Sequence, residues 1–222
     1  MCGVRTPDAA RAARRAGADM IGFVVAAGGP RSVQPPEIHS IIEDLKSDVD
    51  GGRAPCCVAL TVNADDALLM ELAHIVDALQ FHGDETPARV RDARAMTGLK
   101  CLKAIGVAGR ADIDSARAFE SVVDGFIFDA KPSPGADQRG GLGRTFDWDL
   151  LKAYSGETPF MVAGGLTPEN VGKAIKALAG HSSFAGVDVS SGVEAKRGDK
   201  STALVSAFVA EARSAFEGQR SM

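Results

Sequence analysis

The 222-residue sequence predicts an α/β protein, a (β/α)8 TIM barrel that spans residues 1–222 as one domain. Short apolar runs alternate with longer amphipathic stretches, the pattern of strand–helix–strand units in a parallel sheet. Eight such units can be counted, which suits a barrel at the lower limit of its usual size. No Pro/Ser-rich linker divides the chain, so a single domain is expected.

The first of the eight units departs from that pattern because its strand is very short. Only Met1 and Cys2 stand where a first strand is needed, so this strand is apparently clipped. Residues 7–16 predict a helix, because Thr6 is a good cap and Pro7 suits the first helical position. Residues 19–25 form an apolar run typical of a buried strand, and a helix is expected near residues 35–46.

The middle of the chain repeats the unit. Residues 56–62 and 76–82 are predicted strands, each followed by a helical pattern, over residues 64–75 and 87–96. Asn63 is the expected cap of the first of these helices. The next two predicted strands cover residues 99–105 and 125–129, with helices expected over residues 111–119 and 148–154. Before the latter, Gly140 to Gly143 form either a flexible segment or a mobile lid.

The last two units contain the clearest functional pattern. Residues 160–163 and 186–189 are apolar strands that lead into Gly164-Gly165 and into Ser190-Ser191-Gly192, with helices expected over residues 168–178 and 201–217. Glycine lets backbone N–H groups approach a ligand closely, and a helix N-terminus favours an anion. Loops after strands seven and eight of such barrels commonly bind phosphate. The pair of loops therefore predicts a phosphate site, although either turn alone is equally typical of an ordinary connection.

Composition excludes several partners. Net charge is −4, which gives no electrostatic reason to expect nucleic acid or an anionic membrane as a partner. No apolar run reaches the roughly 20 residues of a membrane span, and the N-terminus has no signal-peptide core. The cysteines Cys2, Cys56, Cys57 and Cys101 lack CxxC spacing, so we expect a reduced, cytoplasmic setting. The four histidines are scattered without ligand spacing, so no metal is predicted.

Catalytic side chains in such barrels lie at the carboxyl ends of strands. At these positions the sequence has Cys2, Arg31, His82 and Asp129. A thiol and a carboxylate that face one cavity suggest proton transfer, with one group as base and the other as acid.

Several segments resemble one enzyme family, and they follow one another in the same order along essentially the whole chain. They are Met1-Cys2-Gly3-Val4-Arg5-Thr6-Pro7, Gly22-Phe23-Val24, Pro30-Arg31-Ser32-Val33, Gln80-Phe81-His82-Gly83-Asp84-Glu85, Phe128-Asp129-Ala130-Lys131, residues 140–148, Ala163-Gly164-Gly165-Leu166 and residues 186–194. Each is similar to a segment of phosphoribosylanthranilate isomerase.

The resemblance implies a cofactor-free Amadori rearrangement of N-(5-phosphoribosyl)anthranilate, the third step of tryptophan biosynthesis. By the same resemblance, Asp129 is the general acid that opens the sugar ring and Cys2 the general base that removes the C2′ proton. Arg31 would bind the anthranilate carboxylate, and Gly164, Gly165, Ser190, Ser191 and Gly192 would bind the phosphate. His82 and Asp188 are further substrate-binding candidates.

The proposed roles set two electrostatic requirements. A free thiol has a pKa of about 8.5, which we expect nearby positive charge or a helix end to lower. A carboxyl such as Asp129 has a pKa of about 3.9, which desolvation or a negative neighbour must raise.

Structural roles remain open for several of these residues. Asp129 could cap a helix or anchor a loop, as an aspartate at the end of a strand often does, and Arg31 could be a solvated loop residue. His82 could be a structural histidine. Asp188 could orient the Ser190-Ser191 loop. Members of the family usually have several residues before the cysteine, with a lysine two positions ahead, whereas only Met1 precedes Cys2 here. Either the start is internal to the reading frame, or the barrel closes with a clipped strand. A missing strand would expose two sheet edges, which barrels otherwise avoid.

Three other functions compete with this interpretation. Indole-glycerol-phosphate synthase chemistry needs catalytic lysines, for which Lys103 and Lys131 are the candidates. A ribulose-phosphate epimerase needs metal ligands at strand ends, and a non-catalytic sugar-phosphate-binding barrel needs none of the acid/base groups. The sequence leaves open whether the chain is a monomer or a homodimer, and whether it is strictly specific for its substrate.

Overall fold

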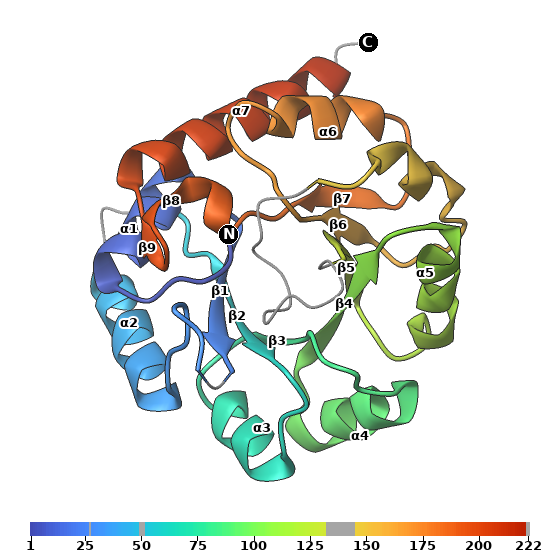
Figure 1. Cartoon of the computed structure of the whole chain (residues 1–222). Helices are drawn as coiled ribbons and strands as arrows, with labels where there is room; N and C mark the ends of the chain where they lie inside the picture. Colours follow the sequence, from blue (N-terminus) through green and yellow to red (C-terminus); the bar gives the residue numbers. More distant parts are fainter. Residues whose placement is uncertain (27, 49–51, 132–144, 221–222) are drawn as a thin grey trace.

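The computed structural model shows a parallel sheet curled into a barrel and surrounded by helices (Figure 1). It describes residues 1–26, 28–48, 52–131 and 145–220. Within them, seven strands follow one another around the sheet in chain order, each parallel to its neighbours. They are β1 (Met20–Val25), β2 (Cys56–Thr61), β3 (Ala78–Phe81), β4 (Lys100–Val107), β5 (Gly125–Ala130), β6 (Phe160–Val162) and β7 (Phe184–Val187). The predicted barrel fold is confirmed.

Helices connect the strands on the outside of the barrel (Figure 1). The α-helices are α1 (Pro7–Ala16), α2 (Pro35–Ser47), α3 (Asp66–Ala73), α4 (Pro87–Thr97), α5 (Arg110–Ser115), α6 (Val171–Ala177) and α7 (Thr202–Arg220), and the 3-10 helices are η1 (Ala116–Phe119), η2 (Trp148–Ala153) and η3 (Ser191–Val193). The bounds predicted for α1 are confirmed. Thr6 accepts a hydrogen bond from the Ala9 N–H at 3.2 Å, and Gly17 ends the helix with φ 86°.

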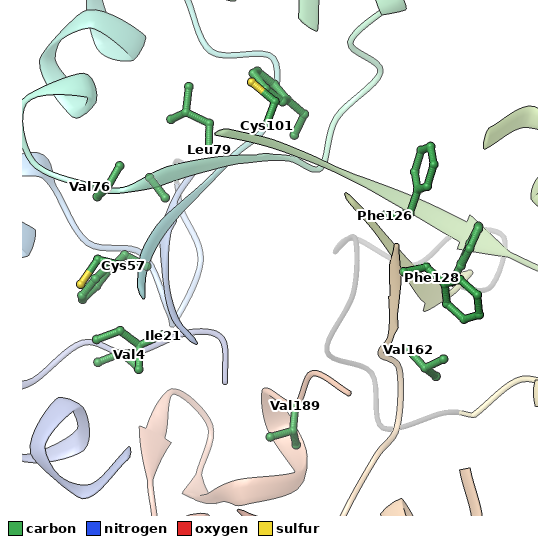
Figure 2. Packing of buried hydrophobic residues seen from close by; sticks show 14 of the residues in the cluster. Val4, Ile21, Cys57, Val76, Leu79, Cys101, Phe126, Phe128, Val162 and Val189 are labelled. Carbon is green, nitrogen blue, oxygen red and sulfur yellow. The ribbon is translucent and has the colours of Figure 1, made fainter. Parts of the chain in front are cut away.

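Strand alternation produces two buried layers. The larger cluster lies between strands and helices and includes Ile21, Leu79, Phe126 and Phe128, as Figure 2 shows around the outside of the sheet. The smaller cluster includes Val58, Leu102 and Ile127, and it fills the barrel interior. Because neighbouring residues of a strand face opposite sides, Asp129 faces inward with Ile127 rather than outward with Phe128.

Residues 1–4 cover the gap between β1 and the chain that leaves β7. The Cys2 N–H donates to Val189 O at 2.8 Å, and the Gly22 N–H donates to Met1 O at 2.8 Å. On the β1 side the pairing amounts to a single parallel bridge between Cys2 and Gly22. The clipped first strand is therefore present as a short paired segment, and it covers the two sheet edges that a missing strand would expose.

The structure corrects some local predictions. Asn63 does not cap α3; Asp65 does, by accepting from the Leu68 N–H at 2.9 Å. Asn63 has φ 50°, and its side chain accepts from the Asp84 N–H at 2.9 Å. The helix after Gly165 begins at Val171 rather than at residue 168.

Two further points concern the later part of the chain. An antiparallel hairpin, β8 (Glu194–Lys196) with β9 (Asp199–Lys200), was not predicted. The segment Gly140 to Gly143 lies outside the described residues. Among the helices that are described, none has the length and apolar character needed to cross a membrane.

Candidate active site

A cavity of about 710 Å³ opens at the carboxyl ends of the strands. Its walls include all but one of the predicted site residues: Cys2, Arg31, His82, Asp129, Gly164, Gly165, Asp188, Ser190 and Ser191. The exception is Gly192, where a Cβ would lie 1.8 Å from Leu166 O. Gly192 thus allows the Ser190-Ser191 loop to pack closely against the backbone of Leu166. It lies outside the cavity lining and fixes the position of the loop that forms the lining.

Cys2 is buried at the junction of the clipped segment with β1. Burial first, and then the Asp188 carboxylate, raise the pKa of the Cys2 thiol to about 12, although the positive charge of Lys200 acts in the opposite direction. The expectation that nearby positive charge or a helix end lowers the pKa of Cys2 is therefore wrong for the ligand-free protein. A cation does lie nearby, as expected, but desolvation of the thiolate outweighs it.

Asp129 ends β5 and faces the cavity with 9% of its surface exposed. Burial, with a smaller contribution from the charge of Asp188, raises the pKa of Asp129 to about 6, against a hydrogen bond from the Ala130 N–H. The expected upward shift and its cause, desolvation with a negative neighbour, agree with this arrangement. Asp129 can therefore hold a proton nearer to neutral pH than an ordinary aspartate.

His82 lies beside Asp129, with 3.9 Å between His82 Nε2 and Asp129 Oδ2. Gln80 Nε2 is 3.3 Å from His82 Nδ1. Both residues line the cavity, so the histidine is held by Gln80 of β3, the strand that it follows, while one ring nitrogen faces the carboxylate. This arrangement allows His82 to contact both a ligand and the proposed acid.

The loop after His82 is fixed by a buried ion pair. Lys103 Nζ lies 3.1 Å from Glu85 Oε2 and also donates to Gly83 O at 2.8 Å. Glu85 in turn accepts from the Asn63 N–H at 2.8 Å. Lys103 is thus bound to a loop behind the cavity wall and is not among the residues that line it. Lys131 pairs with Asp112 at the surface. Neither lysine therefore supports the alternative of an indole-glycerol-phosphate synthase.

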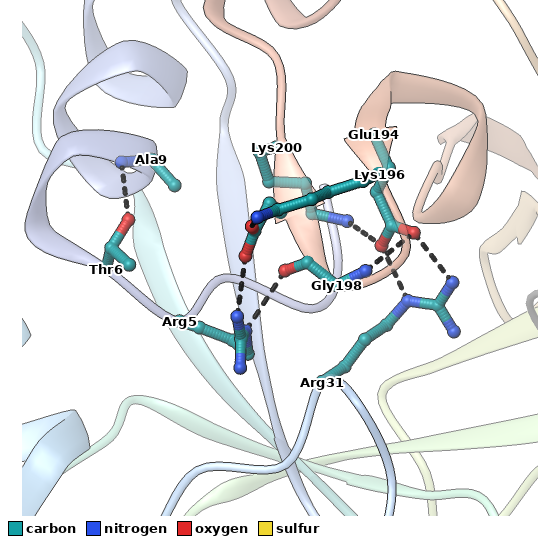
Figure 3. Close-up of polar contacts among 9 residues, drawn as sticks. Arg5, Thr6, Ala9, Arg31, Glu194, Lys196, Gly198 and Lys200 are labelled. Carbon is teal, nitrogen blue, oxygen red and sulfur yellow. Dashed lines mark hydrogen bonds and ion pairs between the residues drawn. The ribbon is translucent and has the colours of Figure 1, made fainter.

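Arg31 is not a solvated loop residue. Its Nε and Nη2 donate to the two carboxylate oxygens of Glu194 at 2.6 and 2.9 Å, as Figure 3 shows. The Arg31 side chain is 12% exposed and that of Glu194 is 5% exposed. Hydrogen bonding to Glu194 raises the pKa of Arg31, so the guanidinium stays charged at the cavity wall.

The two predicted phosphate loops meet at one side of the cavity. Gly164 and Gly165 have φ values of 86° and 62°, conformations that glycine adopts without strain. The Asn170 side chain donates to Gly165 O at 2.9 Å and accepts from the Thr167 N–H at 2.8 Å, which fixes the first loop. Ser190 and Ser191 enter the cavity wall from the second loop.

This site differs in one respect from the prediction. The α-helix expected directly after Gly165 begins only at Val171 and has 7 residues, while Ser191 opens a 3-10 helix of 3 residues. The anion-binding capacity of the site therefore rests on loop backbone and serine hydroxyls more than on an α-helix end.

Asp188 has contacts that support both roles predicted for it, substrate binding and orientation of the Ser190-Ser191 loop. Its N–H donates to Val162 O at 2.8 Å, and Asp188 Oδ1 lies 3.3 Å from the main-chain nitrogen of Met1. Asp188 also lines the cavity, two residues before Ser190. It can therefore orient the serine loop and meet a ligand at the same time.

Sequence reasoning missed Glu194 and Lys200. Lys200 Nζ lies 3.1 Å from Glu194 Oε1 and donates to Ser190 O at 2.9 Å. Glu194 falls within a segment that carries the family resemblance, and the buried cation at Arg31 requires an anion, but only the folded chain shows that the two meet. In the part of the chain that the structure describes, no cluster of three or more His, Cys, Asp or Glu side chains is placed to hold a metal ion.

Comparison with known proteins gives one consistent result. The family model for N-(5'phosphoribosyl)anthranilate (PRA) isomerase matches residues 1–211. The N-(5'-phosphoribosyl)anthranilate isomerase of Rhodospirillum rubrum is 45% identical over 215 residues, with 96% of each chain covered.

Solved structures agree with this. The phosphoribosyl anthranilate isomerase from Thermotoga maritima aligns with a TM-score of 0.80 at 28% identity, covering 96% of this chain and 97% of that one. TrpF from Jonesia denitrificans aligns with a TM-score of 0.73 at 31% identity, covering 97% and 96%. With the fold, the cavity and these matches together, the chain belongs to the N-(5'-phosphoribosyl)anthranilate isomerase family.

Proposed function

We propose that this protein converts N-(5-phosphoribosyl)anthranilate to 1-(2-carboxyphenylamino)-1-deoxyribulose 5-phosphate, the third step of tryptophan biosynthesis from chorismate. Membership of the isomerase family supports the reaction. The observation that carries the proposal is the joint presence of Cys2, Asp129 and the two glycine/serine loops in one cavity. That set provides two proton-transfer groups and a place for the phosphate that holds the sugar between them.

Asp129 acts first in this mechanism, as the general acid. It gives its proton to the furanose ring oxygen, the C1′–O bond breaks, and the nitrogen lone pair forms a protonated Schiff base with C1′. The raised pKa of Asp129, about 6, favours this role because the carboxyl holds its proton more readily than an exposed one. A bound substrate carries a phosphate and a carboxylate, and these negative charges raise the pKa of Asp129 further.

Cys2 acts second, as the general base. The thiolate removes the C2′ proton, the electron pair forms the C1′=C2′ bond, and the cationic nitrogen becomes neutral in an enolamine. The enolamine then loses the proton of its C2′ hydroxyl and gains one at C1′, which gives the ketone. No electrons leave the substrate, so the sequence of steps needs no redox partner.

The ligand-free protein holds these two protons in the opposite arrangement. At pH 7 a carboxyl with a pKa of about 6 is mainly ionised, and a thiol with a pKa of about 12 is mainly protonated. We infer that substrate changes the two states in sequence. Its anionic groups favour protonated Asp129, which takes a proton from solvent on binding. After ring opening, the positive Schiff base next to C2′ lowers the pKa of the Cys2 thiol, which releases its proton to solvent and becomes the thiolate base.

The remaining residues bind the two ends of the substrate. Arg31 receives the anthranilate carboxylate, because a guanidinium at the cavity wall matches a planar anion. The backbone of Gly164 and Gly165 and the hydroxyls of Ser190 and Ser191 receive the phosphate, with Gly192 keeping the second loop close to the first. His82 and Asp188 contact the sugar between these ends.

We also infer the setting in which the enzyme works. All four cysteines are free, which suits the reducing cytoplasm. The enzyme acts there as a monomer or a homodimer on a small-molecule substrate. Its reaction uses no cofactor and no metal.

A direct assay tests the activity. Purified protein is added to fluorescent phosphoribosylanthranilate, the loss of fluorescence is followed, and the product is identified by mass spectrometry as an isomer of equal mass. We expect consumption that saturates with substrate concentration. Binding of substrate without consumption would favour the non-catalytic sugar-phosphate-binding barrel.

A further inference from the structure

The hairpin formed by β8 and β9 contacts both Arg31 and the Ser190 loop, and Figure 3 shows its contact with Arg31. Glu194 begins β8 and accepts both hydrogen bonds from Arg31. Lys200 ends β9 and donates to the backbone oxygen of Ser190 at 2.9 Å and to its hydroxyl at 3.3 Å. One short hairpin therefore contacts residues that bind opposite ends of the proposed substrate.

The contact between Glu194 and Arg31 fixes an orientation as well as a charge. Two parallel bonds from Nε and Nη2 hold the guanidinium plane, whereas a single bond would let it rotate. Glu194 uses two of the five guanidinium N–H groups and leaves those on Nη1 and the second one on Nη2. Arg31 lines the cavity, so these remaining N–H groups are the ones that its guanidinium can offer to a ligand carboxylate.

Glu194 is itself held firmly. Its carboxylate accepts from the Gly198 N–H at 3.1 Å and lies 3.1 Å from Lys200 Nζ. Burial alone would raise the pKa of Glu194, but the hydrogen bond from Arg31 and the charge of Lys200 bring it down to about 2. Glu194 is therefore ionised at neutral pH, and its two cationic partners leave one net positive charge for an anionic ligand.

The hairpin is also tied to the segment that carries Cys2. Arg5 donates to Gly198 O at 3.0 Å and to Asp199 Oδ1 at 2.6 Å (Figure 3). The hairpin thus sets where Arg31 stands relative to the segment of the proposed base.

We propose that Glu194 is a positioning residue that holds the Arg31 guanidinium in the orientation that recognises the aryl carboxylate of the substrate. This inference rests on the proposed function, since it needs a ligand with that carboxylate. It assigns Glu194 a part in specificity, because a correctly oriented guanidinium distinguishes a 2-carboxyphenyl amine from an unsubstituted phenyl amine.

Equilibrium binding tests the proposal without turnover. Two ligands are compared by calorimetry, both of them product analogues with the ketone reduced to an alcohol, one with and one without the aryl carboxylate. We expect wild type to prefer the carboxylate ligand. Glu194→Gln keeps the size of the side chain but offers only one acceptor, so affinity for the carboxylate ligand should fall on the order of ten- to a hundredfold. Affinity for the ligand without the carboxylate should change by less than about twofold.

A double-substitution comparison separates positioning from general stability. If Glu194 acts through Arg31, adding Glu194→Gln to Arg31→Gln should cause no further loss of affinity for the carboxylate ligand. Asp199→Asn is the matched control, because Asp199 lies on the same hairpin and pairs with Arg5 and Lys196 rather than with Arg31. Arg5 keeps its hydrogen bond to Gly198 O in this variant, so the hairpin stays attached and both ligands should bind as they do to wild type.

Several results would overturn the proposal. They are equal affinity of wild type for both ligands, parallel loss of both ligands in Glu194→Gln, additive losses in the double variant, and an equal selective loss in Asp199→Asn. Failure of the proposed function looks different. In that case wild type binds phosphoribosylanthranilate without consuming it, and the comparison of the two analogues still gives its answer.

Discussion

Asp188 illustrates how one carboxylate affects both proposed catalytic groups. Its charge adds to burial in raising the pKa of Asp129 to about 6 and that of Cys2 to about 12. The first shift assists a general acid, whereas the second opposes a general base. At pH 7 the ligand-free site therefore holds a mainly ionised Asp129 and a protonated Cys2. Asp129 gains its proton when the anionic substrate binds, and the thiol becomes a base only when the substrate supplies a positive charge.

The raised pKa of Asp129 also carries a stability consequence. The folded pKa, about 6, exceeds the unfolded value of about 3.9, so the folded state binds more protons over this interval. The free energy of unfolding therefore falls as pH rises from about 4 to about 6, and the penalty persists above that. A pKa difference of about two corresponds to about 3 kcal/mol, which is an upper estimate.

We expect Asp129→Asn to be more stable than wild type at pH 8, by up to about 3 kcal/mol, because the buried charge is removed. At pH 4 most of this gain should vanish, since the carboxyl of the folded wild type is then protonated. Urea unfolding at the two pH values measures the difference.

Asp112→Asn provides a control of opposite sign. Although burial acts to raise it, the pKa of Asp112 is lowered by the Ala108 N–H and by Lys131, so its replacement should reduce stability at pH 8. An Asp129→Asn protein less stable than wild type at pH 8 would contradict the view that this carboxylate is ionised at a cost.

At the scale of elements, the loop after β6 brings backbone unusually close to the proposed acid. A Cβ at Gly164 would lie 2.4 Å from Ala130 N and 2.7 Å from Asp129 Oδ1. Only glycine fits this position, because both its φ of 86° and its surroundings exclude a side chain. The first phosphate loop and the acid are thus built as one unit.

We expect Gly164→Ala to lower turnover on the order of a hundredfold or more, because the new methyl group displaces Asp129 or the loop. Gly98→Ala is the matched control: Gly98 has φ 70°, but nothing lies within 4 Å of its Cβ position. Gly98→Ala should lose about 1–2 kcal/mol of stability from backbone strain, and Gly164→Ala should lose more, because its methyl group also clashes with the Ala130 backbone. Equal turnover in the two variants would show that the close contact between Gly164 and Asp129 does not matter for turnover.

Local chemistry decided which elements the sequence could predict. The bounds of α1 follow from Thr6, Pro7 and Gly17, all of which act within one helical turn of its ends. The cap of α3 was misassigned because Asn63 bonds to Asp84, a partner 21 residues away. The β8–β9 hairpin has strands of 3 and 2 residues, too short to show an apolar alternation.

In the site, too, features set by nearby residues were predicted and features set by distant residues were not. Strand ends in the sequence identified Cys2 and Asp129 as facing one cavity, and the structure places both in its wall. The pKa of Cys2 was beyond prediction because it depends on how far burial outweighs the charge of Lys200. The partner of Arg31 was likewise hidden, since Glu194 lies 163 residues further along the chain.

At the scale of the whole molecule, barrel closure and the proposed proton transfers involve the same few residues. Residues 1–4 complete the ring between β1 and Val189, and Cys2 lies among them. Opening of this segment would remove the proposed base from the site and expose both sheet edges. Closure must therefore be stable for the enzyme to work.

We expect the amides of Cys2 and Gly22 to exchange their hydrogens about as slowly as those in the middle of β2, because both donate across the closure at 2.8 Å. Exchange followed by NMR measures this. Rates for Cys2 and Gly22 within about tenfold of an unfolded peptide would mean that the closure opens locally, and a stable closed ring would then be ruled out.

The central claim is that Cys2 and Asp129 carry the proton transfers. It is tested most directly by the turnover of phosphoribosylanthranilate in Cys2→Ser and Asp129→Asn beside wild type, with circular dichroism and binding of the reduced product analogue as controls. A positioned acid or base contributes about 10²- to 10⁴-fold, so we expect each variant to lose at least a hundredfold in kcat while it folds and binds the analogue. Turnover within about tenfold of wild type in either variant would contradict the role assigned to that residue.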